Sequence, residues 1–300
     1  MQSTARTTTL AFTAAIVGIA TYAGMDVTMK GLALSLGAYN AMLWRSMLTV
    51  LLAAALYFWQ RPTWPDSSAI RLHVWRGTVI SVMAFLFFWG LKYLPVAEAI
   101  GLTFIAPLIA LYLAAVILRE HISGRSIAAS LIGLTGAIII ILGRLSGEYD
   151  DETVLGIGAI LTSAILYAYN LILQRQQALV AKPFEIAFFH NCTVIFLFGC
   201  LSPFLATVPA ISYVPQIALA AVLGLVSLLM MSWAYARAPA NKLIPVEYTA
   251  FIWAAILGWL VFGETVSVTT VFGTLLIVCG CLVAAWRKGT PAEHIETTAA

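Results

Sequence analysis

The stretch LPVAEAIGLTFIAPLIALYLAAVILREHIS occupies residues 94–123, and a related stretch, APANKLIPVEYTAFIWAAILGWLVFGETVS, occupies residues 238–267. The two align without a gap at an offset of 144 residues, and the alignment extends from residue 89 to residue 136. Each copy is an apolar segment opened by a proline, then a turn that contains a glutamate, then a second apolar segment. The matched pairs include Trp89 and Trp233, Pro95 and Pro239, Glu120 and Glu264, and Gly136 and Gly280. The sequence therefore predicts an internal duplication.

The duplication continues toward the N-terminus at an offset of 145 residues. Its matched pairs there are Tyr22 and Tyr167, Lys30 and Arg175, and Arg45 and His190. The two copies also differ chemically, because Glu98 aligns with Lys242, Thr103 with Glu247 and Pro107 with Phe251. A site built at the interface between the copies would therefore be asymmetric.

The composition is that of a polytopic membrane protein. The chain has 300 residues, of which 62% are hydrophobic and only 10% are charged, and its mean hydropathy is +0.96. A soluble domain carries about 25% charged residues. The net charge of +3 comes from basic residues scattered beside apolar segments, which does not indicate nucleic-acid binding.

A bilayer span needs about 20 apolar residues. Ten segments meet this requirement: 9–29, 37–59, 74–92, 95–118, 124–142, 154–174, 184–206, 214–236, 240–262 and 267–286. With ten spans, twelve lysines and arginines fall on the side of both termini, and three fall on the other side. Because basic residues collect in cytoplasmic loops, we expect both termini, including the tail at 287–300, to be cytoplasmic.

Five spans in each half give the two halves opposite orientations in the membrane. We therefore expect an all-α protein of ten transmembrane helices arranged as two inverted five-helix repeats, residues 9–142 and 154–286. Inverted repeats of this kind are typical of secondary transporters, whose substrate sites lie near the bilayer midplane at the repeat interface.

The stretch PVAEAIGLTFIAPLIALYLAAVILRE, followed by Ser123, resembles the signature of the drug/metabolite transporter superfamily of the EamA type. Within that superfamily the chain looks most like the aromatic amino-acid exporters typified by YddG. The resemblance covers about residues 9–287 and implies export of amino acids or related metabolites. It also implies a cavity lined mainly by the first, third, fourth, sixth, eighth and ninth spans, with the fifth and tenth spans paired at the periphery.

Ionisable residues inside a membrane are costly and usually face a cavity or a partner. We expect the substrate to be bound by Tyr22, Asp26, Arg45, Glu98, Tyr112, Tyr167, Asn170 and Trp253. Asp26 and Glu98 are candidates for the substrate ammonium, Arg45 for its carboxylate, and the aromatic residues for its side chain. The alternatives are solvation at the outer interface for Asp26, snorkelling for Arg45 and helix capping for Glu98.

His190 and Glu247 also lie within predicted spans, where they are candidates for proton coupling. The alternatives are a hydrogen bond between helices for His190 and exposure in an inner vestibule for Glu247. Glu120 and Glu264 follow the fourth and ninth spans, and we expect both to satisfy backbone amides at the start of the next helix.

Motifs of enzymes and ATP-driven pumps, such as HExxH, GxSxG and GxxxxGK[ST], do not occur in the sequence. We therefore predict a carrier, not an enzyme, with no cofactor and no bound metal. It would sit in the bacterial inner membrane, as a monomer or homodimer, and export neutral amino acids, including aromatic ones, by alternating access. Protons are candidate coupling ions. The alternatives are export of another metabolite or a drug cation and, less favoured by the sequence, a channel.

Overall fold

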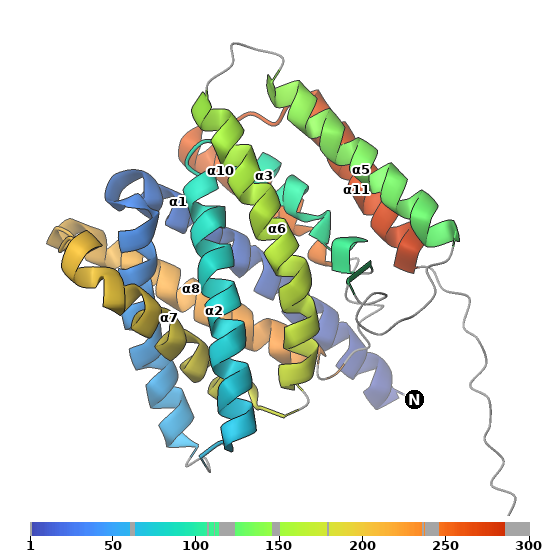
Figure 1. Cartoon of the computed structure of the whole chain (residues 1–300). Helices are drawn as coiled ribbons and strands as arrows, with labels where there is room; N and C mark the ends of the chain where they lie inside the picture. Colours follow the sequence, from blue (N-terminus) through green and yellow to red (C-terminus); the bar gives the residue numbers. More distant parts are fainter. Residues whose placement is uncertain are drawn as a thin grey trace, which may run out of the picture.

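The computed structural model describes residues 2–60, 64–106, 108–110, 112–113, 124–145, 151–178, 180–235, 237 and 246–285. Every regular element in these ranges is a helix. The helices form a single bundle, and several of them cross it obliquely (Figure 1). The all-helical class expected from the sequence is confirmed for this part of the chain.

The chain begins with α1 (Gln2–Trp59), which consists of two helical segments joined at Gly37. Gly37 has φ 78° and ψ 151°, a conformation that is essentially restricted to glycine. The chain reverses at this residue, so that the second segment runs back along the bundle (Figure 1, blue). The first two predicted spans, 9–29 and 37–59, both lie within α1. We call the end of the bundle with the reversal the Gly37 end, and the opposite end the Trp59 end.

The helix α2 (Ser67–Gly90) begins earlier than residue 74, where the sequence analysis placed the start of the third span. Asp66 caps this helix, because its Oδ1 accepts hydrogen bonds from the Ala69 amide at 2.7 Å and the Ser68 hydroxyl at 3.0 Å. The cap satisfies an amide that the first turn of a helix leaves without a partner. The expected start at residue 74 was therefore wrong, and α2 includes Arg71, His73 and Arg76.

The helix α3 (Val96–Thr103) starts directly after Pro95, in agreement with the proline-opened fourth span. Proline is well tolerated at this position because it needs no amide partner. Pro107, at which we expected a bend, lies outside the described residues.

The remaining elements are α5 (Gly124–Leu145), α6 (Asp151–Ala178), α7 (Pro183–Leu205), η1 (Ile211–Tyr213), α8 (Val214–Tyr235), α10 (Ala250–Phe262) and α11 (Val268–Ala285). Most of their ends lie within a few residues of the predicted spans. The exception is α10, which starts at Ala250 instead of residue 240, although residues 238–245 lie outside the described part. Gly263 ends α10 with φ 67°, the left-handed conformation that commonly terminates a helix.

Five described helical stretches are long and apolar enough to cross a membrane. The longest, Leu10–Trp59, contains the Gly37 reversal, and shorter apolar helices occur at Val96–Ala110, Ser130–Gly143, Ala250–Phe262 and Val268–Gly280. The chain is thus a multi-pass membrane protein, whereas the count of ten spans and the inverted orientation stay predictions.

The helices α5 and α11 pair closely at one edge of the bundle (Figure 1, green and red). A Cβ atom added to Gly136 would lie 2.4 Å from the carbonyl oxygen of Gly273, and one added to Gly273 would lie 2.5 Å from that of Gly136. Small residues let the two backbones approach, as is common between membrane helices. The expected pairing of residues 124–142 with 267–286 is confirmed.

The largest group of buried apolar side chains lies toward the Gly37 end of the bundle. It includes Met29 and Met42 on either side of the reversal, Leu94 before α3, and Ile217 in the first turn of α8. Smaller alanine-rich clusters, such as Ala11, Ala15 and Ala234, lie toward the Trp59 end. Among the described residues, the apolar packing is therefore more extensive at the Gly37 end.

Candidate functional site

The reversal of α1 at Gly37 brings Asp26 and Arg45 to the same region of the bundle interior. Asp26 is 2% exposed, and its charge lies within interaction range of the Arg45 guanidinium. The two groups share no hydrogen bond; Arg45 Nη1 instead donates to the sulfur of Met25 at 3.3 Å. Among the described residues, Asp26 Oδ1 and Arg45 Nε have no hydrogen-bond partner. A buried carboxylate and a half-buried guanidinium thus each have an atom without a partner among the described residues.

Two tyrosines border this charged pair. Tyr22 lies one helical turn before Asp26, and Tyr167 projects from α6 close enough to interact with Tyr22. Tyr22 is 50% exposed, yet it interacts with both Asp26 and Arg45. Tyr22 thus combines a half-exposed side chain with proximity to both charged groups.

His190 and Glu247 belong to the same interior region. His190, on α7, lies within charge-interaction range of Arg45 and of Arg76 on α2, and its Nδ1 has no hydrogen-bond partner among the described residues. Glu247 lies just before α10, within range of Tyr167. The alternative for His190, a hydrogen bond between helices, is therefore not seen at its Nδ1 among the described residues.

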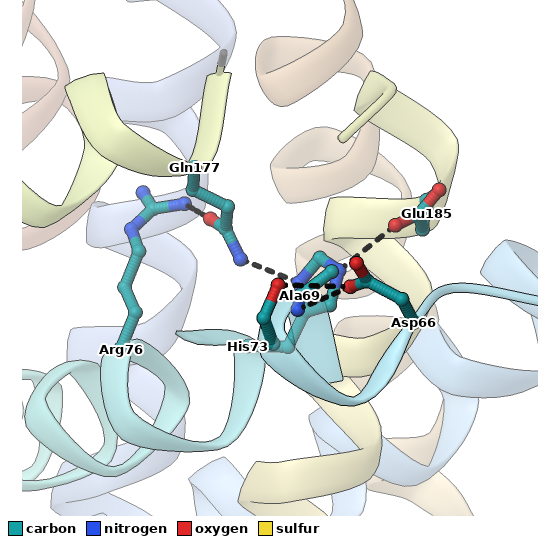
Figure 2. Close-up of polar contacts among 7 residues, drawn as sticks. Asp66, Ala69, His73, Arg76, Gln177 and Glu185 are labelled. Atoms are coloured by element: carbon teal, nitrogen blue, oxygen red, sulfur yellow. Dashed lines mark hydrogen bonds and ion pairs between the residues drawn. The ribbon is translucent and has the colours of Figure 1, made fainter. Parts of the chain in front are cut away.

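A chain of polar side chains connects this region to the Trp59 end (Figure 2). Arg76 Nε donates to Asn170 Oδ1 at 2.9 Å, and Arg76 Nη1 donates to Gln177 Oε1. Gln177 Nε2 lies 2.5 Å from His73 Nδ1, and His73 Nε2 lies 3.0 Å from Glu185 Oε1. The chain thereby joins α2, α6 and α7.

The sequence analysis missed Arg76, which it counted among the basic residues of the cytoplasmic side although residue 76 falls within the predicted span 74–92. Arg76 lies nine residues after Ser67, or about 13 Å along the helix axis, and is only 8% exposed. The signal that points to it is Asp66, since a capping residue at position 66 moves the start of the span seven residues upstream.

Three more residues were expected in the site. Glu98 is 4% exposed and its Oε1 accepts a hydrogen bond from the Thr270 hydroxyl at 3.3 Å, between α3 and α11. Tyr112 lines an apolar groove of about 290 Å³ together with residues of α5, including the exposed Leu131. Trp253 is half-buried on α10. The contact of these three residues with substrate stays a prediction.

Lys30 and Glu264 tie helices together at the Gly37 end. They form an ion pair, and Lys30 Nζ also donates to the Leu94 carbonyl at 2.6 Å. The other oxygen of Glu264 accepts a hydrogen bond from the Val96 amide at 2.8 Å. Glu264 thus satisfies a backbone donor at the start of α3; the expectation that it would serve the helix that follows it in sequence is not what the structure shows.

Comparison with known proteins agrees with this architecture. The model of the EamA-like transporter family matches residues 9–142 and 154–286. A pseudopaline exporter, CntI of Pseudomonas aeruginosa, is 24% identical over 281 residues, which cover 91% of this chain and 95% of that protein. An S-adenosylmethionine uptake transporter of Rickettsia prowazekii is 23% identical over 276 residues, 90% of each protein.

An uncharacterised transporter of Helicobacter pylori is 25% identical over 214 residues, which cover 69% of this chain and 71% of that protein. A protein of known crystal structure is 20% identical to this chain in sequence, and the two structures superpose with a TM-score of 0.59. The match covers 93% of this chain and 96% of the other protein. None of these relatives is named as an aromatic amino-acid exporter, so membership of that branch stays a prediction.

Proposed function

Because this chain belongs to the EamA-like transporter family, and is therefore a membrane transporter, we propose that it exports amino acids and related zwitterionic metabolites by alternating access. The observation that carries the proposal is the interior pair of Asp26 and Arg45. Opposite charges face one region, and each group has an atom without a hydrogen-bond partner in the described part of the chain. An α-amino acid presents the complementary pair, an ammonium and a carboxylate.

In this proposal Asp26 binds the ammonium group and Arg45 binds the carboxylate. Arginine suits the second task because its planar fork of N–H donors matches the two oxygens of a carboxylate. Tyr22 and Tyr167 offer aromatic faces with polar ends to side chains of different shapes, which favours a broad range of neutral amino acids. Leaving either end of the zwitterion unpaired in the interior would cost several kcal/mol, roughly 2–7 for one polar group.

The packing of α1, α2, α6 and α8 supports an inverted repeat. Ser163 on α6 donates to the Met83 carbonyl on α2 at 2.9 Å, and Ser227 on α8 donates to the Gly18 carbonyl on α1 at 2.7 Å. Residue 18 aligns with 163 at the offset of 145, and residue 83 aligns with 227 at the offset of 144. The same pair of repeat positions is therefore hydrogen-bonded twice, each time between the first half and the second, and the donor lies at a different position of the pair each time.

The placement of repeat-equivalent residues supports a site at the repeat interface. Tyr22 and Tyr167 interact with each other, as do Arg45 and His190, and each pair is matched in the sequence duplication. Equivalent residues meet only near a symmetry axis. Transporters with inverted repeats bind their substrates in that position and rock one repeat against the other around it.

The closed Gly37 end supports an inward-open state of the carrier. If both termini are cytoplasmic, the Gly37 end faces the outside, where the large apolar core and the Lys30–Glu264 ion pair lie. The half-exposed Tyr22 would then be reached from the cytoplasm, as loading for export requires. In this proposal Glu98, Tyr112 and Trp253 contact substrate at another step of the transport cycle.

The relatives carry molecules that support this substrate class. One is named for pseudopaline export and another for uptake of S-adenosylmethionine, a derivative of the amino acid methionine. The two names imply opposite directions of transport, so family membership does not determine the direction. In this proposal the direction follows from the substrate gradient and from any coupling ion.

Counterflow of labelled amino acids into proteoliposomes that contain the purified protein tests the proposal. We expect saturable exchange of neutral amino acids, reduced at least about tenfold by Asp26→Asn or Arg45→Gln, since hydrogen bonds to charged groups contribute about 1.5–3 kcal/mol. Asp151→Asn and Lys182→Gln remove exposed charges and are the matched controls. Exchange of a drug cation or a nucleotide sugar but of no amino acid would overturn the substrate class, and flux that never saturates would indicate a channel.

A further inference from the structure

Arg76 is a buried cation held rigidly beside the proposed site. It is 8% exposed, and the next residue, Gly77, packs so closely on α7 that an added Cβ atom would lie 2.7 Å from Thr193 Cβ. This contact fixes the position of α2 next to α7. The Arg76 side chain then interacts with Tyr167 and His190, which both belong to the site.

The hydrogen bonds of Arg76 have a defined direction. An arginine only donates, so Gln177 accepts through its Oε1 and turns its amino group toward His73 (Figure 2). His73 Nδ1 must then accept, which leaves the proton on Nε2 for donation to Glu185. This series of hydrogen bonds orients the Gln177 amide with its oxygen toward Arg76. Gln177 and His73 lie between Arg76 and the negative charge of Glu185, so that Glu185 does not contact Arg76 directly.

The charge of Arg76 is not neutralised by its described partners. Its hydrogen-bond acceptors in the described part of the chain are the amides of Asn170 and Gln177, both neutral. These bonds use two of the five N–H donors of a guanidinium. A buried cation is costly unless an anion accompanies it, and the groups that face Arg76 from α6 and α7 are Tyr167 and His190, not carboxylates.

We propose that Arg76 is a second anion-binding residue of the transport site, so that the substrates include amino acids and amino-acid derivatives that carry a second acidic group. This inference rests on the proposed function. Arg45 and Arg76 both lie within charge-interaction range of His190, so the two guanidinium groups border one region. Arg45 binds the α-carboxylate and Arg76 binds the second acid, while Asn170 and Gln177 hold the guanidinium in position.

Glutamate and glutamine test the inference, because they have nearly the same shape and differ in the charge of the side chain. In wild-type proteoliposomes we expect counterflow of both, with glutamate preferred. Arg76→Gln should lower glutamate exchange about tenfold or more, the effect of losing a charge-assisted hydrogen bond, and leave glutamine exchange within about twofold. Arg71→Gln removes an exposed arginine from the same helix and is the control.

Gln177→Glu separates binding from a purely structural role. This variant gives Arg76 a charged partner, which would preserve or strengthen a structural clamp between α2 and α6. If Arg76 binds substrate, the new carboxylate occupies the subsite and glutamate exchange falls about tenfold or more, with glutamine exchange retained. This variant also tests the inference if Arg76→Gln fails to fold.

The possible outcomes are distinct. Glutamine exchange without glutamate exchange in the wild type would overturn the second subsite and leave the proposed function standing. An unchanged ratio of glutamate to glutamine exchange in Gln177→Glu would also overturn it. Absence of exchange for both of these while phenylalanine exchanges would overturn the inference alone, and absence of exchange for every amino acid tested would overturn the proposed function itself, and the inference with it.

Discussion

Lys30 on α1 and Glu264 in the turn between α10 and α11 form an ion pair, with 6% and 16% of their side-chain surfaces exposed. The pair joins residues 234 positions apart and closes the Gly37 end through the Leu94 carbonyl and the Val96 amide. Removing one partner of a buried ion pair leaves an uncompensated charge, at a cost of about 3–5 kcal/mol. The closed state of this end should therefore depend on the pair.

Lys30→Met should shift the carrier toward a state that is open at the Gly37 end. The measurement is the labelling rate of a cysteine at position 22 by a membrane-impermeant thiol reagent from outside, with the four native cysteines replaced by serine. We expect an increase of at least about tenfold, which corresponds to about 1.4 kcal/mol. Lys92→Met removes a cation that contacts only the Tyr93 ring among described groups and is the control. Equal rates in both variants would show that the ion pair does not hold this end closed.

Gly37→Ala should destabilise the protein by about 1–3 kcal/mol, because the backbone conformation at this reversal suits only glycine. An added Cβ atom at Gly37 meets nothing within 4 Å, so the effect comes from backbone strain and not from a clash. Gly158→Ala is the control, since that glycine is helical and also has open space around it. We expect a lower thermal midpoint in detergent for the first variant and an unchanged or higher midpoint for the second. The reverse order would contradict the assigned conformation of Gly37.

Glu247→Gln and His190→Ala test proton coupling. Both residues lie beside the site, within charge-interaction range of Tyr167 and of Arg45 respectively. If one of them carries a coupled proton, flux in the wild type should change with an imposed pH gradient, and the corresponding variant should lose this response while counterflow at equal pH persists. A wild-type flux that ignores the gradient would identify a facilitative carrier.

Much of the fold could be predicted from the sequence, because apolar length and turn residues determine where membrane helices start and stop. The ends of α5, α7, α8 and α11 agree with the predicted spans within a few residues. The start of α2 was wrong because hydropathy treats Arg71 and His73 as loop residues. A hydropathy profile contains no information on helix capping, and therefore does not show that Asp66 caps the helix.

The site was predictable only in part. Tyr22, Asp26, Arg45 and Tyr167 meet because the reversal at Gly37 and the duplication bring corresponding positions together, and both features are visible in the sequence. Arg76 was missed because its environment depends on Gln177, 101 residues away. Such contacts follow from helix packing, which has no local sequence signal.

Reporter fusions test the inverted orientation of the two halves. Ten spans with both termini cytoplasmic place residue 144 outside and residue 287 inside. We expect an alkaline phosphatase fusion to be active after residue 144 and inactive after residue 287, since this reporter folds only outside the cytoplasm, where its disulfides form. Equal activity at both points would contradict the inverted orientation of the two halves and the transport mechanism that depends on it.

The binding of a zwitterion between Asp26 and Arg45 is tested most directly by competition with analogues that lack one charged group. In wild-type counterflow, phenylalanine should compete at least about tenfold better than phenethylamine, which lacks the carboxylate, and than 3-phenylpropionate, which lacks the ammonium. Asp26→Asn should remove the preference over 3-phenylpropionate and keep that over phenethylamine, and Arg45→Gln should do the opposite. If both variants weaken all three compounds equally, or leave both preferences intact, Asp26 and Arg45 do not bind the two ends of the substrate.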